Sequence, residues 1–371
     1  KPVWHQTIEA AEKFNEPGKF TAFIGYEWTS LLKGNNLHRV VIYKDGGSSA
    51  RQTLPFTLED SADPERLWDA MQAYEEKTGG DLLAIPHNGN LANGIMFDVE
   101  TLSEKPIDKD YASRRQQWER LYEATQIKGD GEAHPFLSPD DEFADYETWD
   151  LGNLDLSEAK KDSMLAGEYA RSGLKRGLEL EQKVGINPYK FGMIGSTDSH
   201  TSLAAVEENN FFGKHSGVEP SPERASHIVL GGENGKIMGS DMASSGYAAV
   251  WAKENTREAI FDAMMRRETY ATTGSRMGVR FFGGWDFTEA DANSRQPAEA
   301  GYSRGVPMGG DLSQAPDGKS PTFLVAAIKD AMSGNLDRIQ IIKGWVGKDG
   351  QAEERVYDVA VSDGRKIDKN G

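Results

Sequence analysis

The chain has 371 residues, of which 37% are hydrophobic and 40 are glycine, a composition typical of a folded globular protein and not of a disordered one. Its 42 basic and 59 acidic side chains give a net charge of −17, which disfavours binding of nucleic acid through a broad basic face. Cysteine is absent, which excludes disulfides, thiolate metal sites and cysteine nucleophiles, and no apolar run approaches the ~18 residues that cross a bilayer.

Helix-like and strand-like segments alternate along the first part of the chain. Apolar spacing indicates the helices, and short apolar runs indicate the strands. In chain order, we expect a helix over 3–14, strands over 20–24 and 37–43, a helix over 63–77, a strand over 82–86, a helix over 112–122, a strand over 121–127, a helix over 163–184, a strand over 191–195 and a helix over 256–268. This alternation favours an α/β fold in which helices flank a parallel sheet or barrel.

Beyond residue 276 the pattern changes to strands without helices. Strand candidates are separated by Gly, Pro, Asp and Ser clusters, and the segment 289–310 is expected to be a long polar loop. The candidates cover 279–282, 322–328, 336–342 and 354–360. We therefore expect two domains, residues 1–276 and a small β-sandwich over 277–371. The sequence leaves open whether the sandwich binds carbohydrate, mediates dimerisation or covers the first domain.

Candidate metal ligands lie at the ends of three predicted strands. Asp198 and His200 follow one strand, and their i, i+2 spacing lets both side chains face one site. His87 and Glu27 each follow another strand, and His38 opens the strand after Glu27. Each residue alone has a simpler interpretation, namely a hydrogen bond in a turn, a satisfied histidine or an exposed loop glutamate. Because α/β sheets and barrels carry their sites at the carboxyl ends of strands, the joint pattern predicts a hydrolytic metal centre.

Four motifs carry a resemblance to a known family. They are Ile24-Gly-Tyr-Glu-Trp-Thr-Ser30, Ile85-Pro-His-Asn-Gly-Asn90, Gln126-Ile-Lys-Gly-Asp-Gly-Glu-Ala-His-Pro135 and Gly195-Ser-Thr-Asp-Ser-His-Thr201. The order of Gly25-x-Glu27, then His38 opening the next strand, Pro86-His87 and Asp198-x-His200 is similar to the later motifs of the PHP (polymerase and histidinol phosphatase) superfamily of metal-dependent phosphoesterases. The resemblance is closest to a PHP-like branch classed as a domain of unknown function, and it extends over nearly the whole chain.

The resemblance implies a fold and a cofactor. The fold is a distorted PHP-type β/α barrel followed by a small C-terminal β-sandwich, and the cofactor is two or three divalent metal ions, Mn, Zn or Fe. By the resemblance, Glu27 bridges two ions, His38 and His87 complete one of them, Asp198 binds the ion beside Glu27, and His200 binds a third. A hydroxide between the ions would attack the phosphorus of a phosphoester.

The sequence departs from the superfamily at its beginning. The superfamily pattern starts with a His-x-His motif followed by an Asp-His motif, and neither occurs among the seven histidines here. We expect these motifs to lie upstream of Lys1. The alternative is a chain that has lost them, in which Glu27, His38 and His87 still suffice for one ion, because three protein ligands plus water is the usual catalytic zinc arrangement.

Three further residues are candidates for contact with a substrate. Arg39 beside His38, Asn88 beside His87 and Lys214 after the Asp-x-His motif are predicted to bind it, although Arg39 and Lys214 are also compatible with solvated surface cations.

His134 lies in a glycine-rich loop after the strand 121–127. It is predicted to be the catalytic residue, as general acid for the leaving group or as a substrate contact, with nearby Glu123 and Glu132 to orient it.

The sequence thus predicts a metal-dependent hydrolase, most simply a phosphoesterase acting on a small anionic molecule. Alternatives are hydrolysis of a sulfate ester or a carbon–nitrogen bond, and a non-catalytic binding protein. No membrane span is expected, an oligomer is compatible with the sequence, and a periplasmic or secreted location is slightly favoured.

Overall fold

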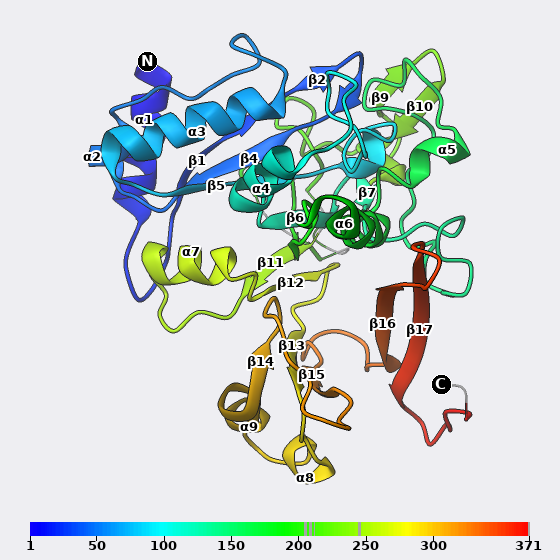
Figure 1. Cartoon of the computed structure of the whole chain (residues 1–371). Helices are drawn as coiled ribbons and strands as arrows, with labels where there is room; N and C mark the ends of the chain where they lie inside the picture. Colours follow the sequence, from blue (N-terminus) through cyan, green and yellow to red (C-terminus); the bar gives the residue numbers. More distant parts are fainter. Residues whose placement is uncertain (204–205, 208–209, 211, 244–245, 370–371) are drawn as a thin grey trace.

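The computed structural model describes residues 1–203, 206–207, 210, 212–243 and 246–369 (Figure 1). Its first sheet is antiparallel, in the strand order β1 (Ile24–Trp28), β4 (Arg39–Tyr43) and β5 (Leu82–Pro86). Trp28 pairs with Arg39, and Arg39 pairs with Pro86. The end of β1, the start of β4 and the end of β5 therefore lie at one edge of this sheet.

Two helices, α1 (Pro2–Phe14) and α3 (Pro64–Thr78), pack against the first sheet (Figure 1). The local sequence delimits α3: the Asp63 side chain accepts the Glu65 backbone N–H at 2.9 Å, and Gly79 ends the helix with a φ of 69°. The core there holds four tryptophans, Trp4, Trp28, Trp68 and Trp118. This apolar core fixes the sheet whose edge carries the candidate site.

The second sheet has the order β7 (Gly129–Asp130), β6 (Leu121–Gln126) and β8 (Gly192–Gly195). The β6–β8 pair is parallel, and its crossover contains α5 (Asp162–Leu165) and α6 (Ala170–Val184). β5 lies beside β6, so the ends of β5, β6 and β8 meet in one region.

Shorter elements complete this part of the chain. They are β2 (Leu31–Leu32), β3 (Asn35–Asn36), α2 (Gly47–Ala50), a 3₁₀ turn at Gly89–Leu91, α4 (Lys109–Trp118), β9 (Ile228–Gly232), β10 (Gly235–Met238), a 3₁₀ turn at Gly239–Asp241, β11 (Tyr247–Val250), α7 (Arg257–Met265) and β12 (Thr269–Thr272). β2–β3, β9–β10 and β11–β12 form two-stranded antiparallel sheets.

The C-terminal part contains two separate sheets (Figure 1). The first has the order β14 (Gly305–Pro307), β13 (Gly278–Gly284) and β15 (Thr322–Ile328), with α8 (Glu289–Ala292) and α9 (Pro297–Arg304) beside it. The second is the hairpin of β16 (Arg338–Val346) and β17 (Ala352–Val361), which packs on α6.

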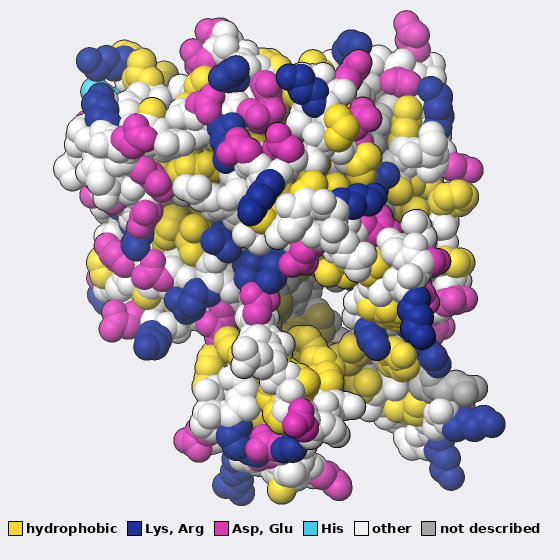
Figure 2. Space-filling view, in the orientation of Figure 1, with side chains coloured by type: hydrophobic (Ala, Val, Ile, Leu, Met, Phe, Trp, Pro, Cys, Tyr) yellow, Lys and Arg dark blue, Asp and Glu magenta, His cyan; other side chains and the backbone are white. Residues whose placement is uncertain are grey.

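These two sheets do not pack into the expected β-sandwich. A cavity of about 1140 Å³ separates them and is lined by apolar side chains that include Phe281, Phe323, Ile341 and Tyr357. Figure 2 shows this hollow between two lobes with hydrophobic walls. The segment 289–310 is also not the long loop that was expected, because it contains α8, α9 and β14.

The predicted PHP-type β/α barrel is wrong. Within the described residues the strands form small sheets, mostly antiparallel, and none closes into a barrel. The physical reason lies in the connections: parallel neighbours need a crossover of about a dozen residues or more, usually a helix. The chain between β1 and β4 is shorter and folds as the β2–β3 hairpin, so β4 returns antiparallel to β1.

Most element positions were predicted well, and two were not. The helix expected over 163–184 is divided into α5 and α6 around Gly167, where an added Cβ would lie 1.8 Å from the carbonyl oxygen of Gly94. The strand expected over 20–24 begins at Ile24 instead.

The division into two domains stays a prediction. Among the described residues, no helix combines the length and apolar character needed to cross a membrane.

Candidate metal centre

Three of the predicted metal ligands meet at the shared edge of the first sheet. Glu27 lies inside β1, one residue before its end, His38 immediately precedes β4, and His87 immediately follows β5. Antiparallel pairing brings these positions together, because the end of β1 lies beside the start of β4. The convergence expected for a parallel sheet is therefore achieved by an antiparallel one.

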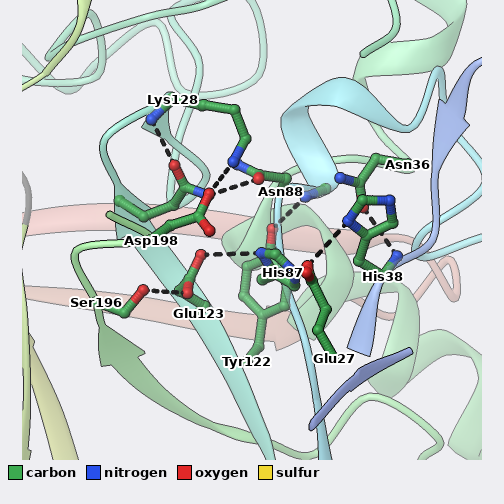
Figure 3. Close-up of polar contacts among 12 residues, drawn as sticks. Glu27, Asn36, His38, His87, Asn88, Tyr122, Glu123, Lys128, Ser196 and Asp198 are labelled. Atoms are coloured by element: carbon green, nitrogen blue, oxygen red, sulfur yellow. Dashed lines mark hydrogen bonds and ion pairs between the residues drawn. The ribbon is translucent and has the colours of Figure 1, made fainter. Parts of the chain in front are cut away.

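The carboxylate of Glu27 lies between two imidazoles (Figure 3). Its Oε1 is 3.0 Å from His38 Nδ1 and 2.8 Å from His87 Nε2. One ligand atom from each of the three residues lies within 4.8 Å of the others. Both histidines are buried, whereas the Glu27 side chain is 33% exposed, so the site opens to solvent on the carboxylate side.

The three residues fit a divalent cation. Two imidazoles and a carboxylate form a donor set that zinc, manganese and iron accept. The Nδ1 of His38 and the Nε2 of His87 face the same oxygen, Glu27 Oε1, so one ion placed there could be reached by all three side chains. The geometry thus contains the donors for one ion.

Electrostatics within the triad favour an ionised glutamate. Burial opposes ionisation of Glu27, but hydrogen bonds from His38 and His87 outweigh it and hold the pKa of this carboxyl below its ordinary value. Burial lowers the pKa of His38. For His87, burial is outweighed by the carboxylates of Glu123 and Glu27, and its pKa is raised.

A second carboxylate supports His87 from behind. Glu123, inside β6 and buried, places Oε1 3.5 Å from His87 Nδ1, an ion-pair distance at which neither atom has a hydrogen-bond partner among the described residues. Its Oε2 accepts a hydrogen bond from Ser196. Figure 3 shows His87 between Glu27 and Glu123. A carboxylate on the far ring nitrogen is the usual support for a metal-binding histidine, since it fixes the tautomer and the ring orientation.

Asp198 lies next to this group but is held by cations. Its Oδ2 contacts the ammonium of Lys128, the ammonium of Lys214 at 2.6 Å and the side-chain amide of Gln126 at 2.7 Å. Gln126 also donates to Asn88 Oδ1 at 2.5 Å.

The backbone at Asp198 and Asn88 is left-handed, with φ values of 46° and 51°. Asn and Asp adopt this conformation more readily than most other side chains, so it fits the local turns without marked strain.

The lysines and His200 titrate abnormally in this environment. Burial, reinforced by the neighbouring Lys214, lowers the pKa of Lys128 well below its ordinary value. Burial lowers the pKa of Lys214 to about 8. Burial followed by the two lysines also lowers the pKa of His200, whose Nε2 is 3.3 Å from Asp198 Oδ1.

Two predicted residues are engaged elsewhere. Arg39 is 1% exposed and binds Glu119, with Nε 3.0 Å from Oε1, so its guanidinium belongs to the core and not to the opening of the site. His134 Nε2 lies 3.3 Å from Asp150 Oδ2, and its ring packs beside Tyr169. Neither residue contacts the Glu27, His38 and His87 group.

For several residues near the site, the structure shows a role that the sequence does not predict. Glu123 was expected to orient His134, but it faces His87, and Glu132 instead binds Arg171. Lys128 and Gln126 were not singled out. A signal for Glu123 exists, because a carboxylate within a fully buried strand is costly unless it is paired. Nothing in the local sequence marks Lys128 as buried.

The comparisons with known proteins give a family and no activity. The chain belongs to the family described as Protein of unknown function (DUF3604), which it matches over residues 1–371. No curated protein and no solved structure matches it.

Proposed function

We propose that this DUF3604 protein is a divalent-metal-dependent hydrolase, most simply a phosphoesterase. The observation that carries the proposal is the placement of Glu27 Oε1 between His38 Nδ1 and His87 Nε2, at 3.0 and 2.8 Å. A buried histidine pair that shares one partly exposed carboxylate, with a second carboxylate behind it, is the arrangement of a metal centre open to substrate.

Glu27, His38 and His87 would hold one ion of manganese, zinc or iron. Such an ion supplies Lewis-acid activation of water and neutralises charge that develops on the substrate. Glu123 orients His87, and Ser196 orients Glu123. The second and third ions implied by the resemblance stay predictions, since Asp198 is already held by Lys128 and Lys214.

The phosphoester is favoured over other bonds by two lines of support. The order of Gly25-x-Glu27, His38, Pro86-His87 and Asp198-x-His200 resembles that of the PHP superfamily. In addition, Lys128 and Lys214 lie beside the centre, where their amines can donate hydrogen bonds to phosphate oxygens. Hydrolysis of a sulfate ester or a carbon–nitrogen bond remains the alternative chemistry.

Metal binding is tested first, by elemental analysis of the purified protein and by calorimetric titration with Mn²⁺ and Zn²⁺. We expect at least one ion per chain in the wild type, and a loss of binding in Glu27→Gln and His87→Asn. His5→Gln, on α1, is the matched control and should bind as the wild type does. Unchanged binding in both site variants would contradict the assignment.

Turnover is tested next with p-nitrophenyl phosphate and p-nitrophenyl sulfate, with added metal and with EDTA. We expect metal-dependent release of p-nitrophenol from the phosphate ester, abolished in Glu27→Gln. Metal binding without turnover of either ester would oppose ester hydrolysis and favour the non-catalytic binding protein.

A further inference from the structure

Three nitrogen donors converge on a single anionic oxygen beside the candidate metal centre. The ammonium of Lys128, the ammonium of Lys214 and the amide of Gln126 all contact Oδ2 of Asp198. These donors come from different parts of the chain. Gln126 is the last residue of β6 and Lys128 follows that strand, whereas Lys214 lies beyond β8. The fold has therefore assembled a cage of donors around one negative oxygen.

The two amines of this cage are deeply buried. Lys128 and Lys214 are 7% and 4% exposed, and both contact the carboxylate of Asp198. Glu27 and Glu123 also act electrostatically on both lysines, although each of these carboxylates is in contact with a histidine. Burying two amines is costly, so an anion that accepts hydrogen bonds from both would offset part of that cost.

The cage borders two partly exposed side chains. His200, which contacts both Asp198 and Lys214, has a side chain that is 50% exposed, and Glu27 on the other side is 33% exposed. Each ammonium also carries three N–H donors and can hold a ligand oxygen in addition to Asp198. Lysine is a common point-charge partner of phosphate oxygens.

We propose that Lys128 and Lys214, with Gln126, form a subsite for the terminal tetrahedral oxyanion of a substrate, as carried by a phosphate or sulfate monoester. The N–H donors that Asp198 Oδ2 leaves unused would receive the ligand oxygens. The subsite deepens the proposed function, because it places a doubly charged end group next to the Glu27, His38 and His87 centre. It selects monoesters over diesters, whose single charge and blocked oxygens satisfy two ammonium groups poorly.

The experiment is calorimetric titration of the full chain with inorganic phosphate, inorganic sulfate and dimethyl phosphate at pH 7, where sulfate is a dianion and phosphate is largely ionised. Each ligand is titrated into EDTA-treated and metal-loaded protein. We expect phosphate or sulfate to bind in both forms and dimethyl phosphate to bind at least about tenfold more weakly. Binding of phosphate but not of sulfate indicates that the substrate is a phosphate monoester. Binding of sulfate but not of phosphate indicates that it is a sulfate monoester.

Variants assign the binding to the two lysines. Lys128→Met and Lys214→Met should each weaken oxyanion affinity by about tenfold or more, as expected for loss of one charged hydrogen bond. Lys44→Met is the matched control: Lys44 also binds two carboxylates, Asp81 and Asp262, but follows β4 at the end opposite His38. Circular dichroism checks the fold, and Lys214→Arg, which keeps the charge, should retain most of the affinity.

The outcomes separate this inference from the proposed function. Oxyanion affinity that is unchanged in both methionine variants, or equal affinity for dimethyl phosphate, overturns the subsite even if metal binds. Lysine-dependent oxyanion binding in a chain that binds no metal supports the subsite and overturns the metal-dependent hydrolase.

Discussion

The Nδ1 of His87 faces Oε1 of Glu123 at 3.5 Å, across the junction of the two main sheets. His87 follows β5 in the antiparallel sheet, whereas Glu123 lies within β6 of the neighbouring one. The opposite ring nitrogen, Nε2, faces Glu27. The histidine is therefore oriented by one sheet and presented to the candidate metal centre by the other.

Replacement of Glu123 should weaken metal binding without removing a ligand. In Glu123→Gln the carboxylate that fixes the His87 tautomer is lost, so we expect metal affinity to fall by about 10- to 100-fold. Calorimetric titration with Zn²⁺ measures the change. Glu132→Gln, which alters a glutamate bound to Arg171 instead, is the control and should bind like the wild type. Equal affinities of the Glu123 variant and the wild type would exclude the orienting role.

Local sequence was sufficient for most elements and for the three residues of the triad. The apolar run 82–86 is β5 with the predicted bounds, and His87 follows it as expected. Strand ends can be predicted because apolar runs and turn residues are local signals. Glu27, His38 and His87 converge because all three are adjacent to ends of strands in one sheet.

Local sequence signals do not predict the direction of the strands or the contacts between residues that are far apart in the sequence. Alternating strands and helices favour a parallel sheet, but the short chain between β1 and β4 leaves no room for a crossover helix. Lys128 and Lys214 reach Asp198 across 70 and 16 residues of sequence. No periodicity reports such contacts, since they depend on how β6 and β8 pair.

The buried carboxylate of Glu119 should be essential for stability. It receives Arg39 Nε and Arg115 Nε at 3.0 Å each and the Trp68 indole N–H at 3.1 Å. Glu119→Ala leaves two buried guanidinium groups without their counter-charge, and we expect a loss of about 3–5 kcal/mol in the free energy of unfolding. Urea denaturation at pH 7 measures it, with the exposed Glu76→Ala as control.

The carboxylate of Glu119 should also make the free energy of unfolding depend on pH. Burial opposes ionisation of Glu119, but Arg39 and Arg115 outweigh it and lower its pKa from the ordinary value of 4.5. The unfolded chain therefore takes up this proton at a higher pH than the folded chain does. The contribution is complete above about pH 4.5 and is lost as the pH falls below it. The Glu119→Ala and wild-type stabilities should converge in acid, and a constant difference would contradict the ion-pair origin.

Gly89 should be intolerant of a side chain because it supports the loop after His87. An added Cβ would lie 2.3 Å from the carbonyl oxygen of Glu168 and 2.5 Å from the Tyr122 hydroxyl, so backbone must move. We expect Gly89→Ala to cost about 1–3 kcal/mol of stability and to weaken metal binding as His87 shifts. Gly217→Ala is the control, since a Cβ there meets no atom within 4 Å. Wild-type metal affinity in Gly89→Ala would show that the loop adapts.

Asp130 offers a stability test of the opposite sign, away from the metal ligands. Burial, with a further contribution from Glu132, raises the pKa of Asp130 from 3.8 to about 8. Between these values the folded chain keeps a proton that the unfolded chain has released, so stability falls as the pH rises from 4 to 8.

Asp130→Asn removes the titration, while its amide oxygen can still accept the Glu132 and Ala133 backbone N–H groups. We therefore expect the variant to be more stable than the wild type at pH 8, by more than the ~1.4 kcal/mol of one pKa unit, with the advantage vanishing towards pH 4. Urea denaturation across this range measures it, with Asp317→Asn in an exposed turn as the control. A variant less stable than the wild type at pH 8 would mean that the Asp130 carboxylate is needed in its charged form.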